Sequence, residues 1–158
     1  MTRLLALLLI ILALVRPAAA HELRPAYLEL AEAAPGHFNV LWKVPAAGDR
    51  RLGLYLRLPA SCNNITEPAS AIENNAYFER WQVSCDGGLK GQTITIDGLR
   101  STLTDVLARI TWADGSVEVE RLTPEQPSLT PKGAQTVWEV ARTYFMLGVE
   151  HILGGIDA

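Results

Sequence analysis

Short runs in which every second residue is apolar, each closed by turn residues, recur along most of this 158-residue chain. In residues 37–44, for example, Phe38, Val40 and Trp42 alternate with other residues. A period of two places such side chains on one face of a β-strand. Residues 61–75, rich in Ser, Asn and Pro, are expected to form a loop. Seven runs occur, at residues 26–31, 37–44, 52–58, 76–84, 92–97, 105–112 and 116–122. The pattern predicts an all-β fold, an Ig-like antiparallel β-sandwich of about seven strands.

The first 20 residues have the layout of a secretory signal peptide. Arg3 supplies a positive charge, residues 4–15 are an unbroken apolar run, and the three alanines 18–20 fit a cleavage site. The run is shorter than the roughly 20 apolar residues that a membrane-spanning helix needs. The alternative is an uncleaved N-terminal anchor. We therefore predict a signal peptide at 1–20, an extracytoplasmic β-domain at 21–131, and a linker and the start of a membrane-associated helix at 132–158.

The charge of the cleaved chain restricts its partners. Removing residues 1–20 leaves 12 basic and 17 acidic residues, a net charge of −5 with histidine neutral. Proteins that bind nucleic acid carry a basic patch, so no nucleic-acid partner is expected. The same balance argues against docking to anionic lipid by charge alone.

Cys62 and Cys85 are the only two cysteines. An even number in an exported chain favours one disulfide, because that compartment is oxidising. Two alternatives are free thiols that never meet and a metal site that uses both sulfurs. The metal site lacks the close C-x-x-C spacing that such sites usually have.

The pattern changes near the C-terminus. Three prolines, at positions 124, 127 and 131, indicate a stiff, extended linker. After Gly133 no proline follows, and apolar residues recur at helical spacing, at Val137, Val140, Tyr144 and Leu147. A helix is therefore expected to begin here, and we expect the chain to stop inside it, because no helix-stop signal follows Ile156.

Three candidate metal ligands, Glu150, His151 and Asp157, lie in the apolar sequence of this helix. Ionisable groups in an apolar helix are costly unless they face a cavity or a partner. The alternative is an amphipathic surface helix with a solvated acidic face. Glu150 and Asp157 are almost eclipsed but about 10.5 Å apart along a straight helix. Either further helices complete the site, or the helix opens at the Gly154–Gly155 pair.

Two blocks of the sequence resemble the HupE/UreJ family. Residues 147–157, LGVEHILGGID, resemble the opening of that family's first membrane helix. Residues 21–30, HELRPAYLEL, are similar to the members that have a large extracytoplasmic N-terminal domain. The family's pattern is a His, five residues, then Asp-His. His151 and Asp157 match its first two ligands, whereas Ala158 stands at the position of the last His.

The resemblance implies a bacterial inner-membrane protein with its β-domain in the periplasm. Members are regarded as nickel permeases or metal-uptake accessories associated with hydrogenase and urease gene sets. The transported or bound ion is then nickel or another divalent metal rather than a resident cofactor, and the partners are the lipid bilayer and a hydrogenase or urease maturation system. Because the last ligand and the later helices are missing, we expect a truncated form that is inactive as a transporter.

The cleaved N-terminus is a second candidate metal site. His21 would become the first residue, and its amine and imidazole together can chelate nickel or copper. His37 is the only other histidine of the β-domain and joins this site if the fold brings the two together. The alternative is that His21 is a frayed terminal residue.

Two functions follow. The first is a transport-associated membrane protein. The alternative is a periplasmic β-sandwich binding module that captures a metal or a partner protein and is anchored by its C-terminal helix. No enzyme is expected, because the sequence contains no G-x-S-x-G, H-E-x-x-H or Cys-His arrangement.

Overall fold

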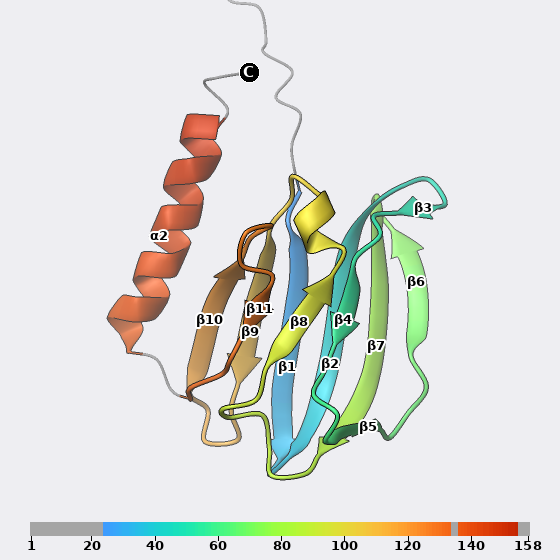
Figure 1. Ribbon diagram of the computed structural model, residues 1–158, viewed down its shortest axis with the longest axis vertical. Helices are drawn as coiled ribbons and strands as arrows, with labels where there is room; N and C mark the ends of the chain where they lie inside the picture. Colours follow the sequence, from blue (N-terminus) through green and yellow to red (C-terminus); the bar gives the residue numbers. More distant parts are fainter. Residues whose placement is uncertain (1–23, 134–135, 155–158) are drawn as a thin grey trace, which may run out of the picture.

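The computed structural model describes residues 24–133 and 136–154, without the side chains of residues 151, 153 and 154. The predicted signal peptide, His21 and Asp157 lie outside the described residues. Within them the chain forms eleven strands, a short 3-10 helix (Leu99–Ser101) and one α-helix, α2 (Val137–Gly154) (Figure 1). The prediction of a mostly β fold with a C-terminal helix is confirmed.

Eight strands form the large sheet. Six of them follow the order β10-β9-β1-β2-β7-β5, with β3 added beside β2 and β6 added beside β7. Their bounds are β1 (Ala26–Ala34), β2 (His37–Ala47), β3 (Arg50–Arg51), β5 (Cys62–Asn64), β6 (Ala69–Glu73), β7 (Ala76–Cys85), β9 (Val106–Thr111) and β10 (Val117–Leu122).

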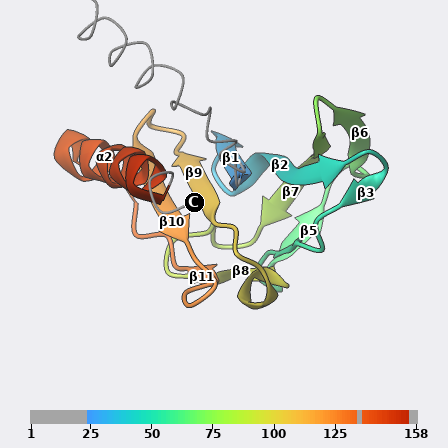
Figure 2. The same cartoon turned by 90° about the horizontal axis from the view of Figure 1, so that it is seen from above.

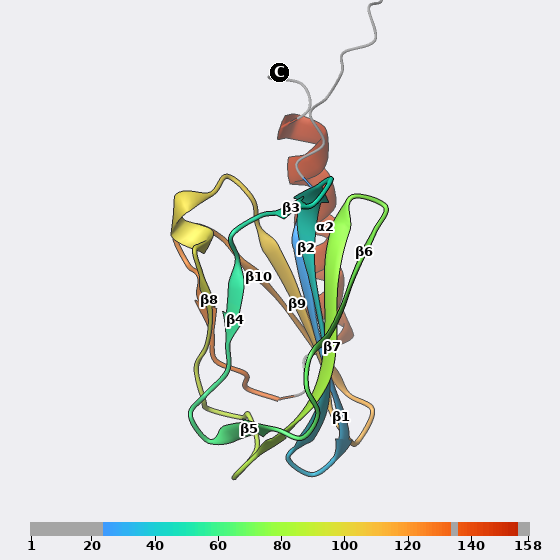
Figure 3. The ribbon, with the colours of Figure 1, turned by 90° about the vertical axis from the view of Figure 1, so that its right-hand side faces the viewer.

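A small sheet covers one face of the large one. It has the order β11-β8-β4, formed by β4 (Tyr55–Arg57), β8 (Ile94–Asp97) and β11 (Ser128–Leu129). Figure 3 shows the two sheets as facing layers. Apolar side chains from both layers meet between them, among them Leu30 and Trp42 from the large sheet and Ile94 and Ile96 from the small one, all at most 1% exposed. The shared core is what joins the layers into a β-sandwich.

The strand pattern differs from the sequence prediction in one pairing. The other pairs are antiparallel, but β1 and β9 run parallel, with Ala26 opposite Val106 and Ala31 opposite Thr111. A fully antiparallel sandwich was therefore wrong. Alternation of side chains fixes which face a strand buries, but it carries no information on the direction of the neighbouring strand.

Two segments predicted as irregular contain strands. The expected loop at 61–75 holds β5 and β6, which both pair with β7. Asn74 and Asn75 have positive φ angles of 50° and 59°, as a two-residue type I′ hairpin turn requires. The expected stiff linker holds β11, which pairs with β8 and buries Leu129. In both segments, pairing with a neighbouring strand stabilises strands that the local sequence pattern does not predict.

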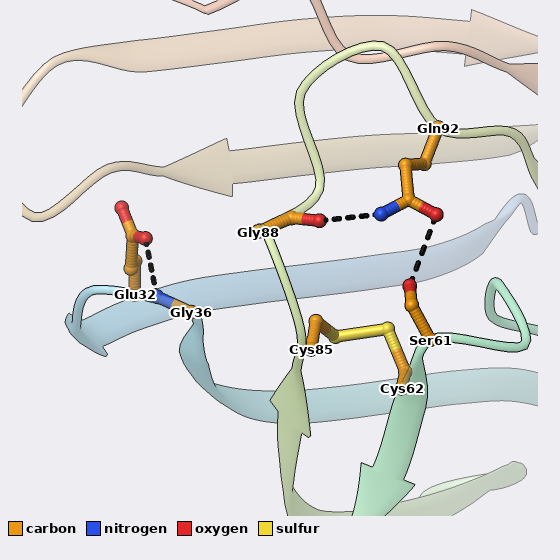
Figure 4. Close-up of a disulfide and its surroundings, with 7 residues drawn as sticks. All are labelled: Glu32, Gly36, Ser61, Cys62, Cys85, Gly88 and Gln92. Carbon is orange, nitrogen blue, oxygen red and sulfur yellow. Dashed lines mark hydrogen bonds between the residues drawn. A yellow bond between two sulfur atoms is a disulfide. The ribbon is translucent and has the colours of Figure 1, made fainter.

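The predicted disulfide between Cys62 and Cys85 is confirmed. The two residues face each other directly across the β5–β7 pair, so the bridge joins neighbouring strands of one sheet. Figure 4 shows a second tie beside it: the Ser61 hydroxyl donates to Gln92 Oε1 at 3.0 Å. Gln92 Nε2 in turn donates to the carbonyl of Gly88 at 2.9 Å. Together these contacts fix the end of the sandwich where β7 turns toward β8.

Helix α2 begins with a capping box. The backbone N–H and hydroxyl of Thr136 donate to Glu139 Oε2 at 2.7 and 2.8 Å, and the Glu139 N–H donates back to Thr136 Oγ1 at 3.3 Å. The helix then runs beside β10, at one end of the large sheet (Figures 1 and 2). Its last turns rise beyond the end of β10 (Figures 1 and 3), while Glu150 still reaches Arg121 of that strand.

Candidate functional site

The candidate site is built where α2 lies along β10. Of the three proposed ligands, Glu150 is described, only the backbone of His151 is described, and Asp157 lies outside the described residues. Within residues 24–133 and 136–154 no group of three His, Cys, Asp or Glu residues is placed to hold a metal ion. Glu150 is therefore the one ligand candidate whose surroundings can be analysed.

Glu150 pairs with an arginine of the β-domain. Its Oε2 forms an ion pair with Arg121 Nη1 of β10. Arg121 also donates from Nε and Nη2 to Asp105 Oδ2, at 2.9 and 2.6 Å. Partial burial alone would lower the pKa of Arg121, but the hydrogen bonds to Asp105 and the charges of Asp105 and Glu150 raise it above its usual value. The guanidinium is thus permanently charged and shared by two carboxylates.

Apolar contacts accompany this ion pair. Val119 lies two residues before Arg121 on the same outer face of β10, and it is fully buried. An outer face covered by α2 accounts for that burial. Val140 and Leu147, seven residues apart and so on one side of the helix, are half-buried. Tyr144 is close enough to Tyr27 of β1 to affect its ionisation.

The opposite side of α2 is also apolar but exposed. Trp138 is 85% exposed, Phe145 is 69% exposed and Ile152 is 65% exposed. These three residues are spaced by seven and recur on one side of a helix, and we call them the outer stripe. Among the described residues, no helix combines the length and the apolar character that crossing a bilayer demands.

Hydrogen bonds to the buried Glu118 hold the segment that leads from the sandwich into α2. Glu118 of β10 is 1% exposed, and its carboxylate accepts the backbone N–H groups of Lys132 and Gly133, each at 2.9 Å. The chain leaving the sandwich is therefore held by a buried charge. Sequence reasoning missed Glu118, Arg121 and Asp105, because their partners are distant in sequence or lie in a segment read as a linker.

A groove of about 530 Å³ lies on the outer face of the large sheet. A row of residues crosses it, from Glu29 on β1 over Leu41 on β2 to Arg80 on β7. In the next row, Gln82 Nε2 donates to Asn39 Oδ1 at 2.9 Å. An acidic and a basic group thus stand about 10 Å apart, two strand spacings, over an apolar floor.

Charged and aromatic groups border this groove. The Tyr27 hydroxyl donates to Glu29 Oε2 at 3.1 Å, and burial together with this bond and the Glu29 charge raises the pKa of Tyr27 to about 12. On the other side, Arg80 and Lys43 both lie over the Phe78 ring, 5.4 and 5.5 Å from its centre. The alternation of apolar and polar residues along these strands does not predict a groove.

The proposed N-terminal metal site has only one described member. His37 is exposed at the start of β2, and its Nδ1 lies 3.1 Å from the carbonyl oxygen of Pro35. His21 lies outside the described residues, so the pairing of these two histidines stays a prediction.

Comparison with protein families and with curated proteins gives no match: no family model fits the chain, and no curated protein is similar to it at a significant level.

Proposed function

We propose that this chain is the extracytoplasmic domain and first helix of a membrane protein of the HupE/UreJ type, which takes part in the uptake of nickel or another divalent cation. In this proposal residues 1–20 direct export, the sandwich lies in the bacterial periplasm, and α2 is associated with the inner membrane. We further propose that the sandwich is of the Ig-like type. A hydrogenase or urease maturation system would use the metal.

The outer stripe is the observation that carries the proposal. Trp138, Phe145 and Ile152 present large apolar side chains to solvent along one side of α2. Exposed apolar side chains in a row of this kind favour an interaction with a membrane or a protein. Tryptophan at position 138, near the start of the helix, suits the lipid–water interface. The disulfide supports an exported domain, since such bridges persist in oxidising compartments.

Glu150, His151 and Asp157 are the residues that would hold the cation. Imidazole and carboxylate donors suit divalent first-row metals, and nickel ranks high among them in affinity. Glu150 and His151 lie in the fourth turn of α2, and Asp157 follows the Gly154–Gly155 pair in the sequence.

Membrane association tests the first half of the proposal. The full chain should stay with the membrane fraction after an alkaline wash. Replacing the outer stripe by Trp138→Asp, Phe145→Asp and Ile152→Asp together should release it, because charged groups on that side oppose burial in lipid. Leu103→Asp is the matched control, since Leu103 is 86% exposed but lies on the β-domain. Release of the unaltered chain by the wash would contradict the proposal.

Nickel binding tests the second half. Membranes that carry the chain should retain more nickel than membranes without it. His151→Ala or Asp157→Ala should abolish this excess, and Glu125→Ala, at an exposed position outside the proposed metal sites, should leave it unchanged. Equal retention by all variants would exclude these residues as ligands.

The groove favours the second candidate, a periplasmic binding module. An acid, a base and an amide pair around an apolar floor can recognise a short extended segment of a partner protein. A photo-crosslinking residue at Leu41, in the middle of the groove, should then give a discrete product that Arg80→Glu abolishes. The same probe at Leu103 is the control. No product at Leu41 in periplasmic extract would count against this candidate.

A further inference from the structure

Arg121 is held in place by contacts that do not involve the helix. Two of its nitrogens, Nε and Nη2, bond to Asp105 Oδ2, at 2.9 and 2.6 Å. The backbone of Asp105 is held in turn, because its carbonyl accepts the N–H of Ala26 at 2.9 Å. The third nitrogen, Nη1, faces Glu150. The guanidinium therefore stays beside the helix carboxylate and cannot turn away without breaking two short charge-assisted bonds.

The position of Arg121 bears directly on metal binding. The side chains of Arg121 and Asp105 are 26% and 25% exposed, and that of Glu150 is 48% exposed, so water screens the buried side of this cluster only in part. A divalent cation at Glu150 would lie within a few ångströms of the guanidinium, and like charges at such a distance repel strongly in a partly dehydrated site. The same carboxylate oxygen cannot serve both cations well.

We infer that Arg121 competes with the metal ion for Glu150, so that docking of α2 on β10 and cation binding at Glu150 exclude one another. This inference rests on the proposed function, which makes Glu150 a cation ligand. Arg121 acts as a positioning residue: it keeps the helix against the β-domain while the site is empty. A bound cation frees the helix from its charged contact.

The other contacts between α2 and the β-domain are few, so replacing Arg121 by a cation at Glu150 should affect how the helix docks. Apart from the ion pair, the docked side of α2 contributes Val140 and Leu147, both half-buried, and Tyr144, which lies near Tyr27 of β1. Beneath them only Val119 of β10 has lost its exposure to solvent completely among the outward-facing residues of that strand. The Glu150–Arg121 pair is thus one of a few contacts that hold the second half of the helix against β10. Losing it should loosen α2 without affecting the sandwich core.

Nickel affinity gives the first test. The full chain in detergent is titrated with nickel chloride by calorimetry. Arg121→Met should bind nickel about five- to tenfold more tightly than the unaltered chain, because one neighbouring positive charge is gone. Arg121→Lys retains the charge and should restore weaker binding, and Glu150→Gln should bind least. Arg57→Met is the matched control, since Arg57 forms a similar pair with Asp97 at 2.5 Å on the small sheet.

Hydrogen exchange of the α2 amides gives the second test. Nickel should speed exchange in the second half of the helix of the unaltered chain. Arg121→Met should speed it without nickel, whereas Arg57→Met should not. Amides of β2 and β7 should stay protected throughout, which shows that each variant is folded.

Two results overturn the inference in different ways. If Arg121→Met binds nickel as the unaltered chain does, while Glu150→Gln weakens binding, Glu150 is a ligand and the competition does not exist. If nickel binding is undetectable, or is the same with Glu150→Gln, then Glu150 is no ligand and both the inference and the role given to Glu150 in the proposed function fail.

Discussion

The sandwich buries its large apolar side chains, whereas helix α2 leaves several of its own exposed to solvent. In the sandwich, two sheets enclose their apolar side chains, and Trp42, for example, is 1% exposed. In α2, Trp138 is 85% exposed, and a shared ion pair together with a few half-buried side chains holds the helix. The sandwich can therefore be stable by itself, whereas the apolar surface of the helix needs something beyond the described residues to cover it.

Substitution of the two tryptophans should show this difference most strongly. Trp42→Ala should destabilise the protein by about 3–5 kcal/mol, because it leaves a large cavity between the sheets. Trp138→Ala should change the free energy of unfolding by less than about 0.5 kcal/mol. Urea denaturation followed by far-UV circular dichroism measures both. Similar losses for the two variants would mean that Trp138 is buried in the protein in solution.

A finer test uses Trp42→Phe. The Trp42 Nε1 has no hydrogen-bond partner within the described part of the chain. Phenylalanine removes this buried polar group and keeps most of the apolar volume, so the loss should be much smaller than with alanine. A loss as large as that of Trp42→Ala would indicate a partner for the indole N–H.

The disulfide should stabilise the sandwich alone. Cys62→Ala with Cys85→Ala should cost about 3 kcal/mol in the chain-entropy description of a loop of this length. The bridge joins β5 to β7, at the far side of the sheet from β10. The hydrogen exchange of α2 in native conditions should therefore not change. Faster exchange in the helix would show that the two regions are coupled through the whole sheet.

Elements that bury an apolar face could be predicted from the sequence, whereas exposed elements could not. Phe38, Val40 and Trp42 alternate along one strand, and this local pattern was sufficient to predict β2 and the buried face. Strand β6 shows no such pattern, because all five of its residues are exposed and its stability comes from pairing with β7. The Asn74–Asn75 turn was the one local signal that could have revealed it.

Most of the candidate site could not be predicted from the sequence. Glu150 and His151 were selected because charged and polar ligands in an apolar helix are unusual. Arg121 has no such signal, because an arginine on the outer face of a strand is ordinary. Only the three-dimensional placement of α2 along β10 brings residue 121 to residue 150. Long-range contacts of this kind leave no period in the sequence.

Glu118 is the direct connection between the two regions, and its replacement should have an intermediate effect. Glu118→Ala leaves the N–H groups of Lys132 and Gly133 without their buried acceptor, which should cost about 1–3 kcal/mol. Glu118→Gln keeps one acceptor oxygen and should cost less. Glu125→Ala, at an exposed position, is the control for thermal denaturation. An equal effect of Glu118→Ala and Glu125→Ala would show that the carboxylate does not hold this segment.

The smallest effect should come from Glu120, on β10 beside the connection. Burial first, and then the negative charge of Glu118, raises the pKa of Glu120 above its usual value. A carboxyl whose pKa is higher in the folded than in the unfolded protein takes up a proton on folding. It therefore opposes stability most when the pH lies above the folded pKa, and this penalty disappears as the pH falls to the unfolded value. Glu120→Gln should thus raise the melting temperature slightly at pH 7 and leave it unchanged at about pH 4. Glu125→Gln should show no such pH dependence, and a destabilising effect of Glu120→Gln at pH 7 would mean that the ionised carboxylate contributes favourably where the sandwich meets the helix.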